Sequence, residues 1–272
     1  MVANDTDAAL LAAQRGKPSP RLAGANLPPV GVQINLSQIA FSGKPILEDL
    51  SLTLTAGEHT CLLGPSGVGK TSILKSLAGL IPMAEGSSIQ TTDDEPVVGR
   101  IAYMGQSDLL LPWASVLDNV LIGQKLKGER PNEGKAIELL KLVGLAANLA
   151  DRPDTLSGGM RQRVALARTL MEDAPILLVD EPFSALDAIT RHKLQALLCD
   201  LTRDRTVLMI THDPMEALRV ADQIIVLCGQ PVKAVKIEKL ATAAPRDLGS
   251  PDISDRYDQI MSLLELDLRD MP

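Results

Sequence analysis

The sequence predicts an α/β fold, in which a parallel β-sheet is covered by helices and joined to an antiparallel β layer and a helical insertion. Two wholly apolar runs, 176–179 and 207–210, flank a helical segment, which is the pattern of parallel strands buried on both faces. The stretch 32–54 alternates polar and apolar residues and is rich in β-forming types. The stretch 116–150 instead carries apolar residues three and four apart, which indicates helices.

Composition narrows the classes of function. The 272 residues are 45% hydrophobic but only 2% aromatic, so the core must be built from aliphatic side chains. A net charge of -7 with a pI near 5.1 speaks against a nucleic-acid partner. The three cysteines, Cys61, Cys199 and Cys228, lack metal-ligand spacing, and we expect buried free thiols in a reducing cytosol.

The two ends of the chain are expected to carry no chemistry. Residues 1–31 show no clear period and are interpreted as a flexible tail, and 241–272 as an acidic helix or tail. No apolar run approaches the roughly 18–20 residues of a membrane-spanning helix. The N-terminus also lacks the basic flank of a secretory signal, so we expect a cytoplasmic location.

In chain order, the antiparallel layer contains strands near 33–36 and 50–54, with a turn at 42–45. An apolar strand at 60–63 then leads through a glycine-rich loop into a helix at 71–80. Further strands are predicted at 100–104 and 224–227. These segments form the start and the middle of an α/β core.

The glycine-rich loop fits G-x-x-x-x-G-K-[ST], with a strand before it and a helix after it as the motif requires. A chance glycine turn is the alternative, which this context disfavours. Backbone N–H groups and the helix N-terminus would surround phosphates, Lys70 would reach the β- and γ-phosphates, Thr71 would ligate Mg²⁺ and Ser72 would touch phosphate. The predicted phosphate-binding residues are Gly64, Pro65, Ser66, Gly67, Val68, Gly69, Lys70, Thr71 and Ser72.

Two carboxylates, Asp180 and Glu181, end the apolar strand that starts at 176, and therefore lie at the sheet edge where ligands bind. We expect Asp180 to hold Mg²⁺, and Glu181 to orient or deprotonate the attacking water. The alternative is a pair of exposed acids that merely close a strand. With the phosphate loop, they indicate a P-loop nucleoside triphosphatase (NTPase) core.

Ser157, Gly158 and Gly159 precede a helical run and offer a hydroxyl, N–H groups and a positive helix end, which together make a second anion site. Taken alone, Ser157 could simply be a helix N-cap. The run L-S-G-G-M-R-Q-R, placed between the phosphate loop and the acidic strand, resembles the ABC ATPases. The resemblance covers about 32–240, with a helical (signature) subdomain at about 107–170.

This resemblance implies further roles. Ser157, Gly158 and Gly159 would contact the ATP of the opposite subunit, Gln106 would be the Q-loop glutamine that senses Mg²⁺ and faces the permease, and Asp187 would close the D-loop. His212 would contact the γ-phosphate, although a lone histidine at a strand end is more often structural. Phe41 would stack on adenine, where the family usually has tyrosine, with a core role as its alternative.

ABC ATPases act as head-to-tail homodimers that hold two ATP molecules, so the resemblance implies a homodimer with ATP and Mg²⁺ as cofactors. Soluble translation factors of this superfamily carry two cassettes, and repair ATPases insert long coiled coils; neither feature is present here. The remaining class is the separate ATPase subunit of an importer. Such a subunit lies on the cytoplasmic face of the inner membrane and pairs with permease subunits and, indirectly, a binding protein.

The segment Leu110–Trp113 looks like the importer group for nitrate, sulfonates, taurine and thiamine-precursor pyrimidines. Trp113, the single tryptophan, would dock the permease, or else pack inside the helical insertion. The run 212–218 also resembles importers, and the chain after Leu240 is too short for an added regulatory β-barrel. The substrate expected first is a thiamine-precursor pyrimidine, with nitrate, sulfonate or taurine second.

Overall fold

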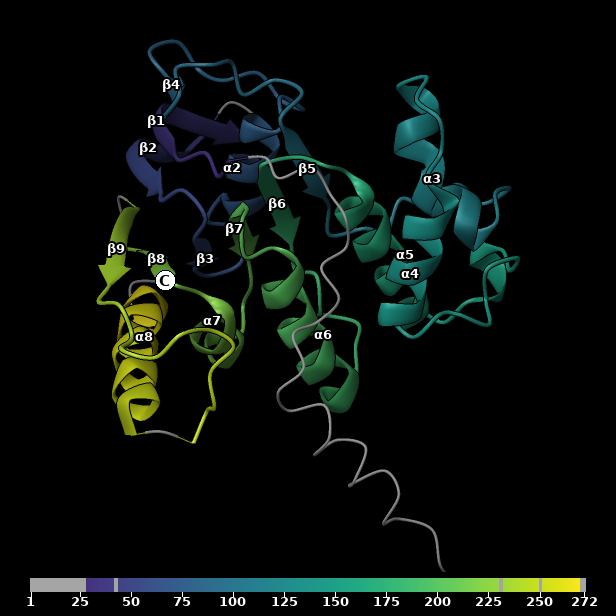
Figure 1. The fold of residues 1–272 in the computed structure, drawn as a ribbon. Coiled ribbons are helices and arrows are strands. Elements are labelled where there is room, and N and C mark those ends of the chain that lie inside the picture. Colours follow the sequence, from purple (N-terminus) through teal and green to yellow (C-terminus); the bar gives the residue numbers. More distant parts are fainter. Residues whose placement is uncertain (1–27, 42–43, 230–231, 250, 270–272) are drawn as a thin grey trace, which may run out of the picture.

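The computed structural model describes residues 28–41, 44–229, 232–249 and 251–269, and within them it confirms the α/β prediction (Figure 1). The strands form two sheets. One has three strands in the order β2-β1-β4, and the other has six in the order β5-β6-β7-β3-β8-β9. In the larger sheet β5, β6 and β7 are sequential neighbours, whereas β3 lies between β7 and β8, so the chain crosses over the sheet to reach it.

The smaller sheet is antiparallel and contains β1 (Val32–Phe41), β2 (Lys44–Leu54) and β4 (Ser88–Thr91). Ile34 pairs with Leu52 on one side and with Ile89 on the other. Alternate residues of β1 point inward, so that Ile34 and Leu36 are buried. The sequence predicts the β1–β2 hairpin, whereas β4 carries too few apolar residues to be recognised.

The larger sheet is mostly parallel. Its strands are β3 (His59–Leu63), β5 (Ile101–Met104), β6 (Ile176–Asp180), β7 (Thr206–Ile210), β8 (Gln223–Cys228) and β9 (Lys233–Ile237). Strand β3 lies in the middle between β7 and β8, and only the edge strand β9 runs antiparallel. The carboxyl ends of β3, β6 and β7 therefore meet at one edge.

Some helices cover this sheet, and others form a separate group beyond β5. In Figure 1, α3, α4 and α5 lie together on the right, apart from α2. The helices are α2 (Lys70–Leu77), α3 (Val116–Leu126), α4 (Glu133–Leu142), the 3₁₀ turn η1 (Pro153–Thr155), α5 (Gly158–Met171), α6 (Ala188–Leu201), α7 (Pro214–Val220) and α8 (Pro251–Arg269).

Two hydrophobic cores lie on opposite faces of the larger sheet. Leu177 and Val179 of β6 face the core that includes α3, α4 and α5, whereas Ile176 and Leu178 face the core beneath α2 and the antiparallel sheet. The alternation along one fully buried strand explains why its sequence is apolar throughout. The sheet edge that carries the site is thus supported from both sides.

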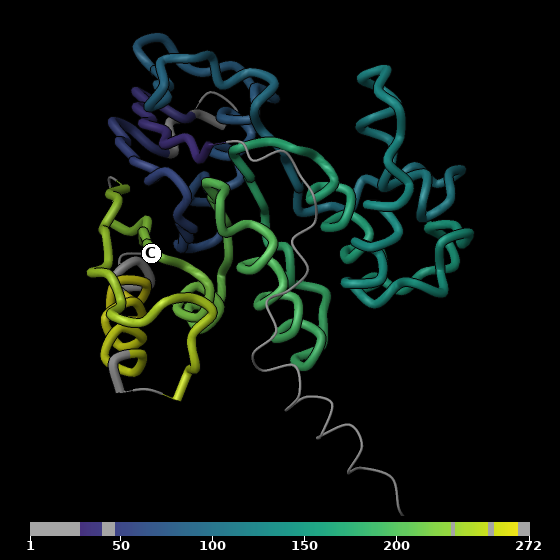
Figure 2. Tube along the Cα trace, viewed as in Figure 1, coloured from purple at the N-terminus to yellow at the C-terminus, as the bar shows by residue number. Residues whose placement is uncertain are grey.

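The two ends of the described chain pack onto this body (Figure 2). Val30, which the sequence assigns to the tail, is buried, and its carbonyl accepts a 2.7 Å hydrogen bond from Thr206 Oγ1. Residues 1–27 of the predicted tail lie outside the described residues. The acidic C-terminal segment forms α8, which packs against α7 and β8 through the buried Ile253 and Ile260.

Two expectations from composition can be compared with the structure. Cys61, Cys199 and Cys228 are all buried thiols that form no disulfide, as the sequence predicts. Across the part of the chain that the structure describes, no helix combines the length and the hydropathy needed to cross a membrane.

Candidate functional site

The phosphate loop lies between β3 and α2 and folds back onto its own lysine. Lys70 Nζ donates to the carbonyl oxygens of Gly64 and Pro65, at 2.7 and 2.8 Å. Gly64 adopts φ 155°, and a Cβ there would stand 2.9 Å from the carbonyl oxygen of Leu227. Burial lowers the pKa of Lys70, although the carboxylates of Glu181 and Asp180 oppose this shift. The loop therefore holds a desolvated cation beside two carboxylates. Phosphate oxygens of a ligand could replace the Gly64 and Pro65 carbonyl oxygens as acceptors for Lys70.

Thr71 and Ser72 occupy the first turn of α2 and are half-buried, while Ser66 and Gly67 at the tip of the loop are exposed. Val68 is buried and belongs to the core beneath the antiparallel sheet. The exposed tip has no side chain across it at Gly67, where a Cβ would meet nothing within 4 Å. This leaves the backbone at the tip of the loop, Ser66 and Gly67, open to a ligand.

Asp180 ends β6 with only 1% of its surface exposed. Its Oδ2 is buried and has no hydrogen-bond partner among the described residues. Desolvation raises the pKa of Asp180, the Thr71 side chain opposes this by hydrogen bonding, and the Glu181 carboxylate adds to it. An orphaned carboxylate oxygen beside a hydroxyl fits a hard divalent cation such as Mg²⁺.

The structure describes no cluster of three His, Cys, Asp or Glu side chains that could hold a metal by themselves. A Mg²⁺ ion held by Thr71 and Asp180 would therefore complete its shell with phosphate oxygens and water, as Mg²⁺ usually does at phosphate sites. The donor set fits a metal that arrives with its nucleotide.

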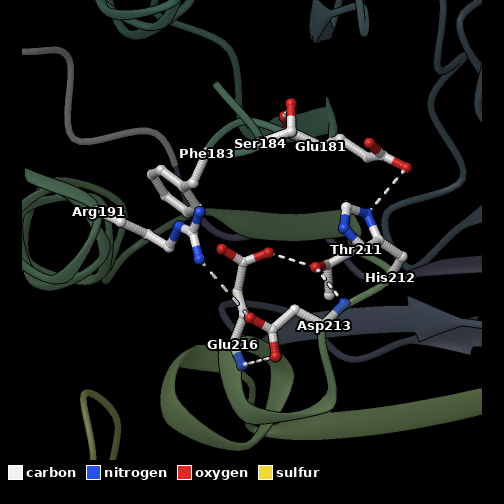
Figure 3. Close-up of a pocket in the computed structure, with 8 residues that line it drawn as sticks. All are labelled: Glu181, Phe183, Ser184, Arg191, Thr211, His212, Asp213 and Glu216. Atoms are coloured by element: carbon white, nitrogen blue, oxygen red, sulfur yellow. Dashed lines mark hydrogen bonds and ion pairs between the residues drawn. The ribbon is translucent and has the colours of Figure 1, made fainter. Parts of the chain in front are cut away.

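The structure brings Glu181, Gln106 and His212 together from three separate loops. His212 Nδ1 lies 3.3 Å from Glu181 Oε1, and Gln106 Nε2 lies 3.4 Å from Glu181 Oε2 (Figure 3 shows the His212 contact). Glu181 itself has φ 49°, an unusual value for a residue with a side chain. Such strain is held by surrounding structure and is common at functional sites.

A buried network fixes the loop that carries His212. The Thr211 hydroxyl donates a short hydrogen bond to Glu216 and accepts one from the Asp213 amide at 3.1 Å. Glu216 also accepts a 3.0 Å bond from Gln195 Nε2 of α6, and desolvation raises its pKa. Figure 3 shows Glu216 beneath this loop. The backbone is therefore anchored on both sides of His212.

These side chains line one small cavity next to Glu181. Its volume is about 40 Å³, enough to hold a water molecule. The residues that line it are Glu181, Phe183, Ser184, Arg191, Thr211, His212, Asp213 and Glu216. The sequence identifies Glu181 and His212 among them.

The predicted signature residues and Asp187 lie at the N-termini of α5 and α6, and they do not line this cavity. Ser157 is the N-cap of α5, where its hydroxyl accepts from the Met160 amide at 3.2 Å. Asp187 is the N-cap of α6 and accepts from the amides of Ile189 and Thr190. Gly159 lies against the loop between β6 and α6, since a Cβ at Gly159 would stand 3.0 Å from the Ala185 carbonyl oxygen. The capping alternative for Ser157 thus holds, and an exposed cap still leaves its oxygen open to a ligand.

Two aromatic residues were predicted to have binding roles. The structure describes the backbone of Phe41 at the end of β1, while its side chain lies outside the described part, so adenine stacking stays a prediction. Trp113 is 71% exposed, which is incompatible with its packing inside the helical insertion. Nearby Leu109 is also exposed, at 67%.

Sequence reasoning missed the buried polar side chains that hold the site, namely Gln162, Gln195 and Glu216. Each is less than a tenth exposed. Gln162 stands in the run L-S-G-G-M-R-Q-R and Glu216 in the run 212–218, whereas only its spacing onto the apolar face of its helix could have revealed Gln195. Neither run shows what these side chains bond, because their partners are distant in the chain.

A phosphate loop at the end of one strand, with two carboxylates at the end of a nearby strand, defines a P-loop nucleoside triphosphatase. A family model described as "ABC transporter" matches residues 47–184. The chain belongs to the ABC transporter family, as an ATP-binding subunit with ABC-type ATPase activity.

Related proteins match over most of this chain. An uncharacterized ABC transporter ATP-binding protein of Haemophilus influenzae is 42% identical and covers 86% of this chain and 98% of its own length. The aliphatic sulfonates import ATP-binding protein SsuB 1 of Rhodococcus jostii is 39% identical, covering 92% and 97%. The taurine import ATP-binding protein TauB of Yersinia pestis is 42% identical, covering 72% and 79%.

Among solved structures, the ATP-binding cassette MJ0796 resembles this fold with a TM-score of 0.66 and 28% identity. The match covers 77% of this chain and 100% of that one, which was solved as a dimer in a post-hydrolysis state with ADP and Pi.

Proposed function

We propose that this chain is the ATP-hydrolysing subunit of an importer for organosulfur acids, namely sulfonates or taurine. The observation that supports ATP hydrolysis best is the position of Glu181, with Gln106 at 3.4 Å and His212 at 3.3 Å from its two carboxylate oxygens. A general base must lie within hydrogen-bond reach of the water whose proton it accepts, and these two contacts orient the Glu181 carboxylate. Asp180, Lys70 and the phosphate loop supply the binding half.

In this proposal water attacks the γ-phosphorus of ATP, the bond to the β-phosphate oxygen breaks, and Glu181 accepts the proton of the water. Lys70 and His212 neutralise charge on the γ-phosphate oxygens as the bond breaks. Mg²⁺ held by Thr71 and Asp180, and sensed by Gln106, would supply further charge neutralisation. Phe41 would bind adenine through its ring face.

We propose that the working form is a homodimer. Ser157, Gly158 and Gly159 lie at the exposed start of α5, which Figure 1 places on the far side of β5 and β6 from α2. They would bind the ATP held by a partner's phosphate loop, with Asp187 next to them at the interface. The dimeric MJ0796 cassette supports this arrangement.

The permease would dock on the loop that follows Gln106. Leu109 and Trp113 are both more than half exposed there, and an exposed apolar pair on a fixed loop suits a protein interface. Arg168 holds Leu109 by donating to its carbonyl at 2.8 Å, and the buried Asn119 holds the Leu111 amide at 2.7 Å. The proposed location is therefore the cytoplasmic face of the inner membrane, bound through the permease.

The substrate class rests on the relatives. Two of them carry sulfonates or taurine in their names, which favours the second choice from sequence. The first choice, a thiamine-precursor pyrimidine, has no support among the relatives described above. In the proposed transporter neither substrate class contacts the ATPase, since the binding protein and the permease would recognise the solute.

The test is the ATPase rate of this chain assembled with its permease and binding protein in nanodiscs, titrated with taurine, an alkanesulfonate, nitrate and an aminopyrimidine. We expect stimulation by taurine or the alkanesulfonate. Stimulation by the aminopyrimidine alone would restore the first choice. A rate indifferent to every compound and to the permease would instead indicate a soluble ABC ATPase outside transport.

A further inference from the structure

Gln162, in the second turn of α5, makes three hydrogen bonds to the segment that carries Glu181. Its Nε2 donates to the Glu181 carbonyl oxygen at 2.9 Å and to Ser184 Oγ at 3.2 Å. Its Oε1 accepts from the Ala185 amide at 3.0 Å. The Gln162 side chain is only 7% exposed, while its partners Ser184 and Ala185 lie at the surface, so the three bonds are partly buried.

The bonds act where the backbone is least relaxed. Glu181 has φ 49°, a strained conformation for a residue with a side chain, which persists only where neighbouring groups hold it. The amide of Glu181 is held by the Ile210 carbonyl of β7 at 3.0 Å. Its carbonyl is held by Gln162 and by the Ser184 hydroxyl. Gln162 therefore holds one side of a peptide turn whose other side is fixed by the sheet.

From these contacts we infer that Gln162 is a positioning residue for the hydrolysis step, acting through Glu181. This inference rests on the proposed role of Glu181 as the group that activates water. Gln162 lies too deep to touch nucleotide itself, but loss of its bonds lets the turn relax and moves the carboxylate. A displacement near 1 Å is enough to slow an enzyme reaction by about 100-fold.

The same contacts connect Glu181 to the signature helix. Ser157, Gly158 and Gly159 lie one turn before Gln162 on α5, and Gly159 packs against the Ala185 carbonyl. A shift of α5 on engagement of the partner's nucleotide is therefore transmitted to the backbone of Glu181. Gln162 makes the water-activating group of one site depend on the state of the other.

The test replaces Gln162 with methionine, which has nearly the same shape but neither an N–H donor nor an amide oxygen. For Gln162→Met we expect kcat for ATP to fall between roughly 10-fold and 100-fold, with the ATP KM and the nucleotide Kd changed less than about 2-fold. Thr169→Val is the matched control, because Thr169 is also buried on α5 but, among the residues that the structure describes, its hydroxyl bonds only to the Ala165 carbonyl of its own helix. It should hydrolyse ATP at the wild-type rate.

A second variant guards against a general loss of structure. Gln162→Glu keeps the shape and the acceptor for Ala185, and at a pH high enough to ionise this buried carboxyl it has no proton to donate to Glu181. It should also be slow, with ATP affinity and the circular dichroism spectrum at the assay temperature retained, although the buried charge lowers the melting temperature. Normal turnover in Gln162→Glu would mean that the bond to Glu181 does not matter, and would overturn the inference.

A double-mutant cycle then asks whether Gln162 acts through Glu181. In a Glu181→Gln background, single-turnover hydrolysis should be no slower when Gln162→Met is added, because the group being positioned is already absent. An equal further loss in that background would overturn the inference. If Glu181→Gln itself hydrolysed ATP at the wild-type rate, the proposed role of Glu181 would be wrong and the inference would fail with it. Normal turnover in Gln162→Met would overturn the inference alone and leave the proposed role of Glu181 intact.

Discussion

His212 Nδ1 lies 3.3 Å from Glu181 Oε1, although the two residues follow different strands of the sheet. The contact exists because β6 and β7 are parallel neighbours, so their carboxyl ends meet at the same edge. Gln106 reaches the other oxygen of Glu181 from the loop after β5, which pairs with β6 on its other side. One carboxylate thus lies where the loops of three adjacent strands converge.

The first prediction concerns that carboxylate. Glu181→Gln keeps the shape and the hydrogen-bonding capacity but removes the basic group, so we expect ATP hydrolysis to fall by about 100-fold or more, since general bases contribute roughly 10²–10⁴. ATP binding should persist and trap a dimer, measured by light scattering after gel filtration. Glu138→Gln, at an exposed position of α4, is the control and should change neither rate nor mass. An unchanged rate in Glu181→Gln would remove Glu181 from its proposed role.

The second prediction concerns the phosphate loop. Lys70→Ala removes the cation that now bonds the Gly64 and Pro65 carbonyls, and should abolish ATP binding measured by calorimetry. Lys75→Ala, an exposed lysine on the same helix, removes equal charge and should bind ATP normally. The comparison separates a specific phosphate contact from a general loss of positive charge. Normal Mg-ATP affinity in Lys70→Ala would contradict the phosphate-loop assignment.

Much of this fold follows from sequence because the central strands of the larger sheet are mostly apolar and the phosphate loop between β3 and α2 carries a recognisable motif. Strands β6 and β7 are buried on both faces, so each reads as an unbroken apolar run. The edge strands β4 and β9 were missed, since β4 is only partly buried and β9 is mostly polar on its exposed side. An edge strand faces solvent and needs no distinctive sequence.

The candidate site likewise contains residues that the sequence predicts and residues that it does not. Lys70, Asp180 and Glu181 follow from motifs because their chemistry demands particular residue types at fixed spacing. Gln162 and Glu216 also stand in the runs that resemble the family, but their supporting roles do not follow from sequence, because such a role is defined by where the partner lies in the fold. The Glu216 side chain bonds to Gln195 of α6, and no local pattern in either helix predicts that pairing.

The third prediction concerns the pH dependence of stability. Desolvation raises the folded-state pKa of Asp180, so its ionised form opposes folding. This cost is absent below the unfolded pKa near 3.8, grows as pH rises from there and is complete above the folded pKa. Asp180→Asn should therefore stabilise the nucleotide-free chain at neutral pH, by roughly 1–3 kcal/mol. The gain should shrink as pH falls toward the unfolded pKa. Urea unfolding across pH measures it.

The opposite sign is expected at Asp187, whose pKa is lowered chiefly by the hydrogen bond from the Thr190 side chain. Asp187→Asn should lose stability at neutral pH and not at acid pH.

Asp180→Asn should also bind Mg-ATP more weakly than wild type, while the binding of ATP without Mg²⁺ is unaffected. A lower stability of Asp180→Asn at neutral pH would show that Asp180 is satisfied by groups of the protein itself.

The fourth prediction compares the two glycines at the start of α5. A Cβ at Gly159 would stand 3.0 Å from the Ala185 carbonyl oxygen and 3.2 Å from Leu186 Cδ2, whereas one at Gly158 meets only Arg161 Nη2 at 3.8 Å. Gly159→Ala should destabilise the chain by about 1–3 kcal/mol, and Gly158→Ala should not. Both should weaken the ATP-dependent dimer in a Glu181→Gln background. A normal dimer with Gly158→Ala would separate this glycine from the partner's nucleotide.

The fifth prediction concerns Trp113, which is 71% exposed on a loop that the buried Asn119 fixes. Because the side chain covers no core, Trp113→Ala should leave the melting temperature and the ATPase rate of the isolated chain unchanged. Stimulation by the permease should fall by about 10-fold or more, as truncation of a central aromatic anchor costs at least 2 kcal/mol. Leu126→Ala, also exposed at 80% but on α3, is the control.

As the single tryptophan, Trp113 also reports binding directly, because its fluorescence shifts to shorter wavelength when water is excluded from the ring. Permease in nanodiscs should produce that shift in the wild-type chain, and empty nanodiscs should not. Asn119→Leu removes the hydrogen bonds that hold the loop, so it should weaken permease binding even though Trp113 is still present. An unshifted spectrum together with full stimulation would place the permease contact on another surface.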